Sequence, residues 1–467
     1  MNFKIIFLSI ASFISVFVNS QELKTYSPPK ELIYSKHNDD FTVQVRKPKG
    51  EWQDLFEYNV FVDNDTQSKA SFVNFDFSGS VEVKVRLNNG LLQNVRIRPD
   101  LQGIKPVVSG NEFVFTLTKP QKLSVEVNGN KRNNLHLIAN AIETVLPDSM
   151  NYHVLYFGPG IHRPKDLPGE DFVIPSNTYV YIAGGAVLQG RIICNRVENV
   201  VISGRGFIDG GLRGVEITHS KNITVDGISI VNPKHYSVYL GGSQNITIRN
   251  INAFSMGSWT DGIDMMSCSD VNIDNVFLRT SDDCFAIYAH RWDFYGNSTN
   301  INVSNSVLWA DVAHPINIGL HGNTSCEGDT IQHISFKNIY ILEHDEDDPN
   351  YQGAMAICTG DYNIVKNINF EDIRVDEIEE GQLFNLRVVD NPKYCNGPGR
   401  SIENVSFKNI SYNGNLPNPS VMEGFDRKRQ VKNVTFTNLK INNKVVLNAD
   451  TTILKPGKFV EAIKFVK

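Results

Sequence analysis

The chain has 467 residues and a formal net charge of −6, and its basic residues are scattered along the sequence. Nucleic-acid-binding proteins usually gather Lys and Arg on one face, so this distribution argues against a nucleic-acid partner. A chain of this length can bury a large core and hold two domains.

The first twenty residues predict a secretory signal peptide. A basic residue precedes an apolar run from 5 to 18, and Val18 and Ser20 are small enough to precede a cleavage site before Gln21. The run is short for a bilayer crossing, and no second candidate follows it. We therefore predict a signal peptide over 1–20 and a secreted protein, periplasmic or extracellular, with no membrane span. We expect a monomer.

Residues 21–145 show the alternating pattern that is typical of antiparallel strands. Apolar and polar positions alternate over 80–87, 112–117 and 123–127, and Asn- and Gly-rich turns separate such runs. This pattern predicts a small antiparallel β-sandwich. The segment 135–140 is compatible with a last strand or a short helix, and we favour the strand.

A repeat occupies residues 146–467. An Asn or Asp followed by alternating apolar residues recurs from Asn199 to Asn433, at spacings of 23, 23, 25, 30, 33, 34, 37 and 29 residues. One coil per repeat, with insertions on loops, predicts a right-handed parallel β-helix in an all-β protein. A β-propeller and a leucine-rich horseshoe fit the spacing and composition less well. The repeated Asn suits a left-handed turn and can form a ladder from coil to coil.

Acidic residues recur at equivalent positions of neighbouring coils. Aligning the coils by their apolar residues places Asp261 above Asp282 and His314 below Asp283, and adjacent strands lie roughly 4.8 Å apart. Carboxylates this close raise at least one pKa, which supplies the acid and the base that glycoside hydrolysis needs. We therefore predict that Asp261, Asp282 and Asp283 are catalytic. Attack by water calls for carboxyl groups about 6.5–9.5 Å apart, and direct attack for about 5–5.5 Å.

The motifs around these residues carry a family resemblance. Trp259-Thr-Asp261-Gly, Ser281-Asp282-Asp283-Cys and Ala313-His314-Pro-Ile-Asn-Ile-Gly resemble successive motifs of the polygalacturonase family. The aspartate motifs and the preceding sandwich also resemble the dextranase and isopullulanase family.

Both resemblances imply an enzyme that cleaves the α-glycosidic bonds of a poly- or oligosaccharide with inversion. They imply that Asp282 is the general acid and that Asp261 and Asp283 position and deprotonate water. His314 would tune the acid or contact sugar. The chain departs from polygalacturonases at 352–358, where no basic residue matches the motif that grips a uronate.

Other residues are candidates for substrate binding because they flank the acidic row or lie on the insertion after it. These are His314, Tyr236, Trp259, His290, Arg291 and Trp292. Asp264 is expected to be structural. The acidic run 343–348 predicts a solvated loop, with calcium binding as the alternative. The six cysteines form disulfides or stay as buried thiols, and their spacing shows no zinc pattern. No metal or cofactor is expected for catalysis.

Two other functions remain open on the same scaffold. A polysaccharide lyase would use the acidic residues to hold Ca²⁺ and a Lys or Arg as base, but no basic residue falls in the aligned row. A non-catalytic carbohydrate-binding β-helix would keep aromatic rows without needing adjacent carboxylates.

Overall fold

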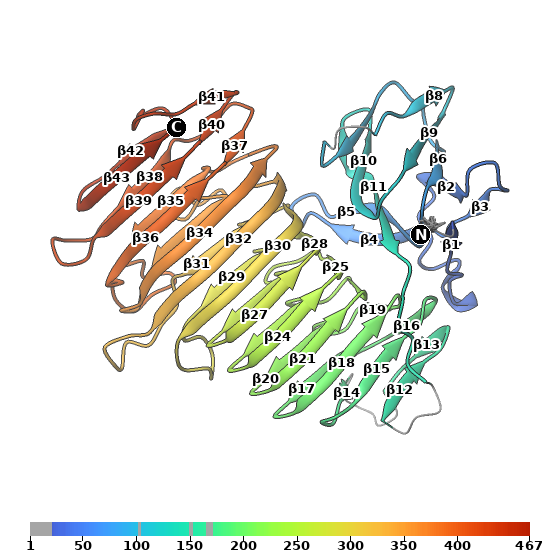
Figure 1. The fold of residues 1–467 in the computed structure, drawn as a ribbon, viewed down its shortest axis with the longest axis horizontal. Helices are drawn as coiled ribbons and strands as arrows, with labels where there is room; N and C mark the ends of the chain where they lie inside the picture. The colour runs from blue at the N-terminus through green and yellow to red at the C-terminus, as the bar shows by residue number, and fades with distance from the viewer. Residues whose placement is uncertain (1–20, 101–103, 149–152, 165–170) are drawn as a thin grey trace, which may run out of the picture.

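The computed structural model describes residues 21–100, 104–148, 153–164 and 171–467. The predicted signal peptide lies outside the described residues. Two regions follow one another along the chain: an N-terminal domain, and a long stack of coils running from β12 to β43 (Figure 1). The predicted fold class is confirmed: an all-β chain with a parallel β-helix after a small antiparallel domain.

The N-terminal domain consists of two facing sheets. Pairing is antiparallel throughout except between β5 and β11, which run parallel. The first sheet contains β1 (Glu22–Lys24), β4 (Tyr58–Val62), β5 (Ser68–Ser78), β7 (Val95–Arg98), β10 (Gln121–Val127) and β11 (Asn130–Ala141). The second contains β2 (Phe41–Arg46), β3 (Gln53–Asp54), β6 (Val81–Leu87), β8 (Val107–Ser109) and β9 (Glu112–Leu117). A short 3-10 helix, η1 (Lys30–Leu32), lies between β1 and β2. The segment 135–140 is part of β11, so the strand prediction is confirmed.

Valines and phenylalanines at alternate positions form the core of this domain. On β6, Val81, Val83 and Val85 are fully buried, whereas the residues between them are half-buried. They pack with Phe75 and Phe113 between the two sheets. The period of two read from the sequence is therefore the period of burial.

The β-helix has a long sheet that bends around each coil. Its strands are β12 (Val154–Phe157), β13 (Gly160–His162), β15 (Tyr179–Ile182), β16 (Ala186–Leu188), β18 (Glu198–Gly204), β19 (Phe207–Asp209), β21 (Lys221–Asp226), β22 (Ser229–Val231), β24 (Gln244–Arg249), β25 (Asn252–Phe254), β27 (Ser269–Asp274), β28 (Phe277–Thr280), β30 (Ser298–Ala310), β32 (Thr330–Glu343), β34 (Ile364–Val375), β36 (Ser401–Lys408), β37 (Ser411–Tyr412), β39 (Val431–Thr437), β40 (Lys440–Ile441), β41 (Lys444–Val445) and β43 (Val460–Val466). Each coil stacks its strands on those of the coil before it, so the isoleucines and valines that point inward form one continuous core.

A second, shorter sheet closes each coil on the opposite wall. Its strands are β14 (Asp171–Val173), β17 (Arg191–Asn195), β20 (Val215–Thr218), β23 (Val238–Gly241), β26 (Ile263–Met266), β29 (Phe285–Tyr288), β31 (Ile316–Gly319), β33 (Met355–Thr359), β35 (Phe384–Val388), β38 (Ser420–Glu423) and β42 (Leu454–Pro456). Consecutive strands pair in parallel with little shift, so turns of neighbouring coils lie above one another.

The predicted asparagine ladder is present. Asn199, Asn222 and Asn245 have φ values of 58°, 57° and 56°, in the left-handed region. The side-chain amide of Asn222 donates to Asn199 at 3.0 Å, and that of Asn245 donates to Asn222 at 2.7 Å. Asn300 continues the row onto Asp270. Asn is repeated because it tolerates this backbone and bonds its counterpart on the next coil.

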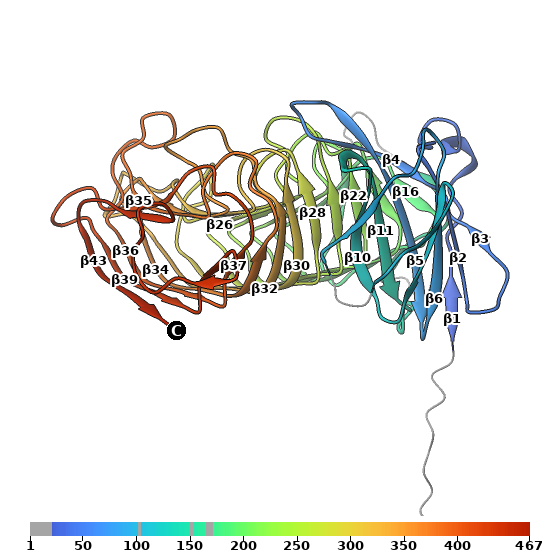
Figure 2. The ribbon, with the colours of Figure 1, turned by 90° about the horizontal axis from the view of Figure 1, so that it is seen from above.

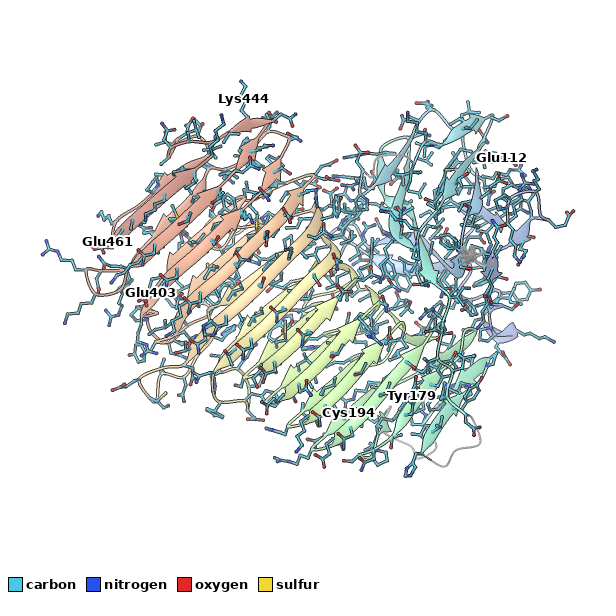
Figure 3. All side chains as sticks on the ribbon, viewed as in Figure 1. Glu112, Tyr179, Cys194, Glu403, Lys444 and Glu461 are labelled. Carbon is cyan, nitrogen blue, oxygen red and sulfur yellow. The ribbon has the colours of Figure 1, made fainter. Side chains whose placement is uncertain are left out.

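The N-terminal domain packs along the side of the β-helix. Phe72 and Ile138 of that domain share a buried cluster with Phe254, Phe277 and Trp309 on successive coils. Figure 2 shows the domain beside the green and yellow coils, and side chains fill the space between the two parts in Figure 3. Of the strands covered in this way, β25 and β28 lead directly into the turns that carry the predicted aspartates, and β30 leads into the turn that carries His314.

Candidate active site

The predicted aspartates lie in two successive turns that lead into the shorter sheet. Asp261 lies between β25 and β26, and Asp282 and Asp283 lie between β28 and β29. Pairing of these strands aligns Ile263 with Phe285, which puts Asp261 in register with Asp283. The predicted register of Asp261 over Asp282 is wrong by one residue, because the two turns differ in length and the hydrogen bonds of the strands set the frame.

The three carboxylates nevertheless converge. One oxygen from each of Asp261, Asp282 and Asp283 lies within 4.8 Å of the others, a spacing that would also suit a cation. All three line a pocket of about 490 Å³. The pocket is also lined by Tyr236, Trp259, Tyr288, Arg291, Ala313, Leu320, His321, Glu346, Tyr351, Lys393 and Tyr394. The predicted acidic residues are thus the floor of a pocket large enough for a sugar.

Asp283 is surrounded by hydrogen-bond donors from the following coil. Its Oδ1 accepts from the main-chain N–H of His314 at 3.1 Å and from the Nδ1 of that ring at 2.7 Å. Its Oδ2 accepts from the Nδ2 of Asn317 at 2.6 Å. These three donors fix the orientation of the carboxyl group.

His314 is a buried cation that balances Asp283. The ring is fully buried, and its Nε2 donates to the carbonyl oxygen of Tyr351. Since both ring nitrogens face acceptors, both carry a hydrogen. Burial lowers the pKa of His314, but the charge of Asp283 and its hydrogen bond, together with Glu346 and the carbonyl of Tyr351, outweigh burial and raise this pKa to about 9.

The carboxyl group of Asp282 has different surroundings from that of Asp283. Burial, followed by repulsion from Asp283, raises the pKa of Asp282 to about 6. Main-chain N–H groups of Trp259 and Asp283 each donate to its carboxyl group at 3.0 Å, and they fix its direction. A pKa of about 6 leaves much of Asp282 protonated at mildly acidic pH, which is what a general acid requires.

Asp264 lies behind Asp261 and contacts it. Asp264 is fully buried, and among the described residues no N–H or hydroxyl group donates to either of its oxygens or to Oδ1 of Asp261. Burial raises the pKa of both groups well above their usual range, and repulsion from Asp282 and Asp283 adds to the rise. The charge of Arg291 partly compensates both groups.

The coils of the β-helix match the sequence model of a known enzyme family. The model of glycosyl hydrolases family 28 matches residues 212–452. The chain belongs to this family.

Relatives of this family 28 chain are enzymes of fungi and plants. It is 24% identical over 286 residues to the putative galacturan 1,4-alpha-galacturonidase A of Aspergillus niger, covering 53% of this chain and 59% of that protein. It is 24% identical over 248 residues to an exopolygalacturonase of Zea mays, covering 48% and 57%. The chain thus spans less than two thirds of the length of these relatives.

Among solved structures, the chain is similar to Dex49A from Penicillium minioluteum. The match has a TM-score of 0.62 and 13% sequence identity, and it covers 94% of this chain and 96% of the other. At this identity the likeness concerns the fold alone, and it extends over the N-terminal domain as well as the coils.

The predicted substrate-binding residues differ in whether they reach the pocket. Tyr236, Trp259 and Arg291 line the pocket of the family 28 chain. His314 does not line the pocket: it has no exposed surface and donates to the carboxylate of Asp283.

The remaining two candidates lie outside the pocket lining. Trp292 packs near Trp259, with ring centroids 6.1 Å apart, and extends the rim. The ring of His290 packs against Tyr295, with centroids 4.0 Å apart. The insertion after the acidic turn therefore contributes Arg291 to the pocket and Trp292 to its edge.

Several pocket residues were not predicted because they come from long insertions without periodic pattern. Glu346 and Tyr351 lie between β32 and β33, and Lys393 and Tyr394 follow β35. Lys393 is paired with Asp348 at 3.6 Å. The coil at 352–358, which corresponds to the uronate-gripping motif of polygalacturonases, contains no basic residue. Arg291 and Lys393 instead bring two cations to the pocket from other parts of the chain.

The other expectations have clear outcomes. Glu343, in the acidic run, is buried and pairs with Arg98 and Lys131 of the N-terminal domain, so the run is not wholly a solvated loop.

All six cysteines are free thiols, and all but Cys326 are buried. Within the described ranges, no helix has the length and apolar character that crossing a bilayer requires.

The protonation of Asp282 predicts a pH dependence. If this residue donates the proton, kcat/KM should decline above pH 6, approaching tenfold per pH unit, because the protonated fraction declines through a pKa of about 6. The sign is fixed by the role: an acid works only while protonated. A profile of kcat/KM from pH 4 to 9 checks this, and a rate that rises between pH 6 and 8 would exclude Asp282 as the acid.

Proposed function

We propose that this protein is an inverting glycoside hydrolase that cleaves α-glycosidic bonds in a galacturonan-type polysaccharide. The observation that carries the proposal is the difference in surroundings of two adjacent carboxyl groups. The pKa of Asp282 is raised to about 6, whereas Asp283 is paired with the cationic His314. Glycoside hydrolysis needs such a pair: one group protonates the leaving oxygen, and the other activates a nucleophile.

The spacing of Asp261 and Asp283 supports water as the nucleophile. Their nearest oxygens lie within 4.8 Å. One water that bonds both at the ordinary 2.7–2.8 Å, with a tetrahedral angle, spans about 4.5 Å. Asp282 also lies within 4.8 Å of them, which is closer than the carboxyl separation of about 6.5–9.5 Å in inverting enzymes. The anomer of the first product is therefore the critical test of this part.

The charge of the pocket supports an acidic sugar. Arg291 lines the pocket and forms no salt bridge with another described residue, whereas Lys393 is paired with Asp348. A guanidinium group matches a carboxylate in two parallel hydrogen bonds. The relatives named for galacturonan cleavage suggest the same substrate class. Trp259, which is half exposed at the rim, offers a flat surface for a sugar ring.

A substrate screen tests this function. The full chain is incubated with polygalacturonic acid, its methyl ester and dextran, and new reducing ends are counted. We expect release from the free acid, less from the ester because its charge is masked, and none from dextran. Release from dextran alone would contradict the uronate assignment. Binding of all three without new reducing ends would indicate a carbohydrate-binding protein.

A lyase is the second candidate, because the three carboxylates can hold a cation and Arg291 lies in the same pocket. A lyase leaves an unsaturated sugar that absorbs near 235 nm and loses activity with a chelator. We expect neither absorbance nor chelator sensitivity. Both together would replace the hydrolase by a lyase.

A further inference from the structure

The turn that carries Asp282 is bonded to the N-terminal domain. Ser281, which precedes the acid, is buried and its Oγ accepts the main-chain N–H of Asn64 at 3.0 Å. The same hydroxyl donates to the carbonyl of Ser255, in the turn before Asp261, at 3.2 Å. A loop of the other domain is thus one residue away from the acid.

The strand before this turn is held by the same domain. Arg279 on β28 is fully buried and donates twice to Asp311, at 2.9 Å each. Its Nη1 donates to Asn134 at 2.8 Å and contacts Nε2 of His136 at 3.1 Å, both on β11. The ion pair that precedes the acid therefore reaches into the N-terminal sheet.

Hydrogen bonds of Asp63 hold the backbone of this loop. The Oδ1 of Asp63 accepts from the main-chain N–H groups of Asp65 and Thr66, and Arg132 donates to its Oδ2. The N–H of Asp63 donates to Asp311 at 3.1 Å. Such a side-chain-capped turn fixes the two N–H groups that reach across the interface.

We propose that the N-terminal domain is a positioning element of the active site, which holds the Asp282 turn through Asn64, Asp63 and β11. This inference rests on the proposed function, because it assigns the domain to the same acid. Trp259 and Asp283 fix the carboxyl group from within the β-helix, and the N-terminal domain fixes the backbone behind it. A small displacement of the acid lowers turnover steeply, since a shift of about 1 Å can reduce a rate about a hundredfold.

Two variants on opposite sides of the interface test the proposal. Ser281→Ala removes the acceptor on the β-helix, and Asp63→Ala removes the cap in the N-terminal loop. Neither side chain lines the pocket. We expect kcat to fall about tenfold in each with KM unchanged. We also expect the alkaline limb of the pH profile to move to lower pH, because a looser turn admits water to Asp282.

Matched controls separate positioning from general stability. Ser306→Ala is the first, because Ser306 is also buried, accepts one main-chain N–H at 3.2 Å and donates to one carbonyl at 2.7 Å. Asp65→Ala is the second, because this exposed residue lies two positions from Asp63. Both controls should keep the wild-type kcat and pH profile. Circular dichroism and thermal unfolding confirm which variants are folded.

The outcomes distinguish this inference from the function itself. If wild type hydrolyses polygalacturonic acid and folded Ser281→Ala and Asp63→Ala keep its kcat and pH limb, the positioning role is overturned. The same holds if the controls lose as much activity as the variants. If wild type hydrolyses no glycan, the proposed function itself fails. Should one variant not fold, the other decides, because they remove different sides of the contact.

Discussion

Asp282→Asn should reduce hydrolysis by about a thousandfold or more and leave the fold intact. General acid catalysis contributes about 10²–10⁴ in rate. The N–H groups of the amide are too weakly acidic to transfer a proton to the leaving oxygen. Asn has nearly the same shape, and its oxygen can still accept one of the two N–H bonds from Trp259 and Asp283. Initial rates and thermal unfolding of the purified variant measure both effects.

Two comparisons make this prediction specific. Asp270→Asn is the matched control, since Asp270 occupies the asparagine ladder where most coils already carry Asn. It should retain wild-type activity. An aryl glycoside with an activated leaving group should restore much of the rate of Asp282→Asn, because that group leaves without a proton. Full activity of Asp282→Asn on the polymer would exclude the acid role.

His314→Gln should lower both stability and turnover. Removing one partner of a buried ion pair costs about 3–5 kcal/mol, because the charge of Asp283 remains buried without its partner. Turnover should fall about a hundredfold, since Asp283 loses the charged ring whose hydrogen bond orients it toward the attacking water. Urea unfolding and steady-state rates measure the two effects.

The neighbouring His344→Gln is the matched control for charge. His344 is also fully buried, but burial lowers its pKa to about 3, so its ring is neutral. Its replacement should lower turnover much less than that of His314. Equal losses in both variants would show that packing of an imidazole, and not its charge, supports Asp283.

The ion pair also predicts how stability depends on pH. The pKa of His314 is raised from 6.5 to about 9 in the folded state, so folding binds a proton there. This contribution is fully present below about pH 6.5 and is lost as pH rises through 9. The free energy of unfolding of wild type should therefore fall between pH 7 and 10, and His314→Gln should lack this component.

The β-helix and the aspartate cluster were predictable because both depend on repetition. The spacing of the asparagines fixed the coil, and equivalent places on adjacent coils brought Asp261 near Asp282 and Asp283. The one-residue error in the register of Asp261 arose in the turns, because the apolar residues of the turns are not periodic and cannot align one coil with the next. Strand hydrogen bonds, which align Ile263 with Phe285, decide the register instead.

The walls of the pocket and the contact between domains were not predictable from pattern. Tyr351 and Lys393 reach the pocket from insertions, and the bond from Asn64 to Ser281 joins residues 217 positions apart. Nothing periodic links such residues. Asp264 illustrates the same limit: it was expected to be structural, and only the fold shows that it is buried near Asp261 with no hydrogen-bond donor among the described residues.

Proton NMR of the first product released from polygalacturonic acid tests the central claim most directly. If Asp282 protonates the leaving oxygen while Asp261 and Asp283 direct a water, the new reducing end appears first as the β anomer and only later equilibrates. An α anomer at the earliest times would mean direct attack by a carboxylate. It would contradict the roles assigned to these three residues.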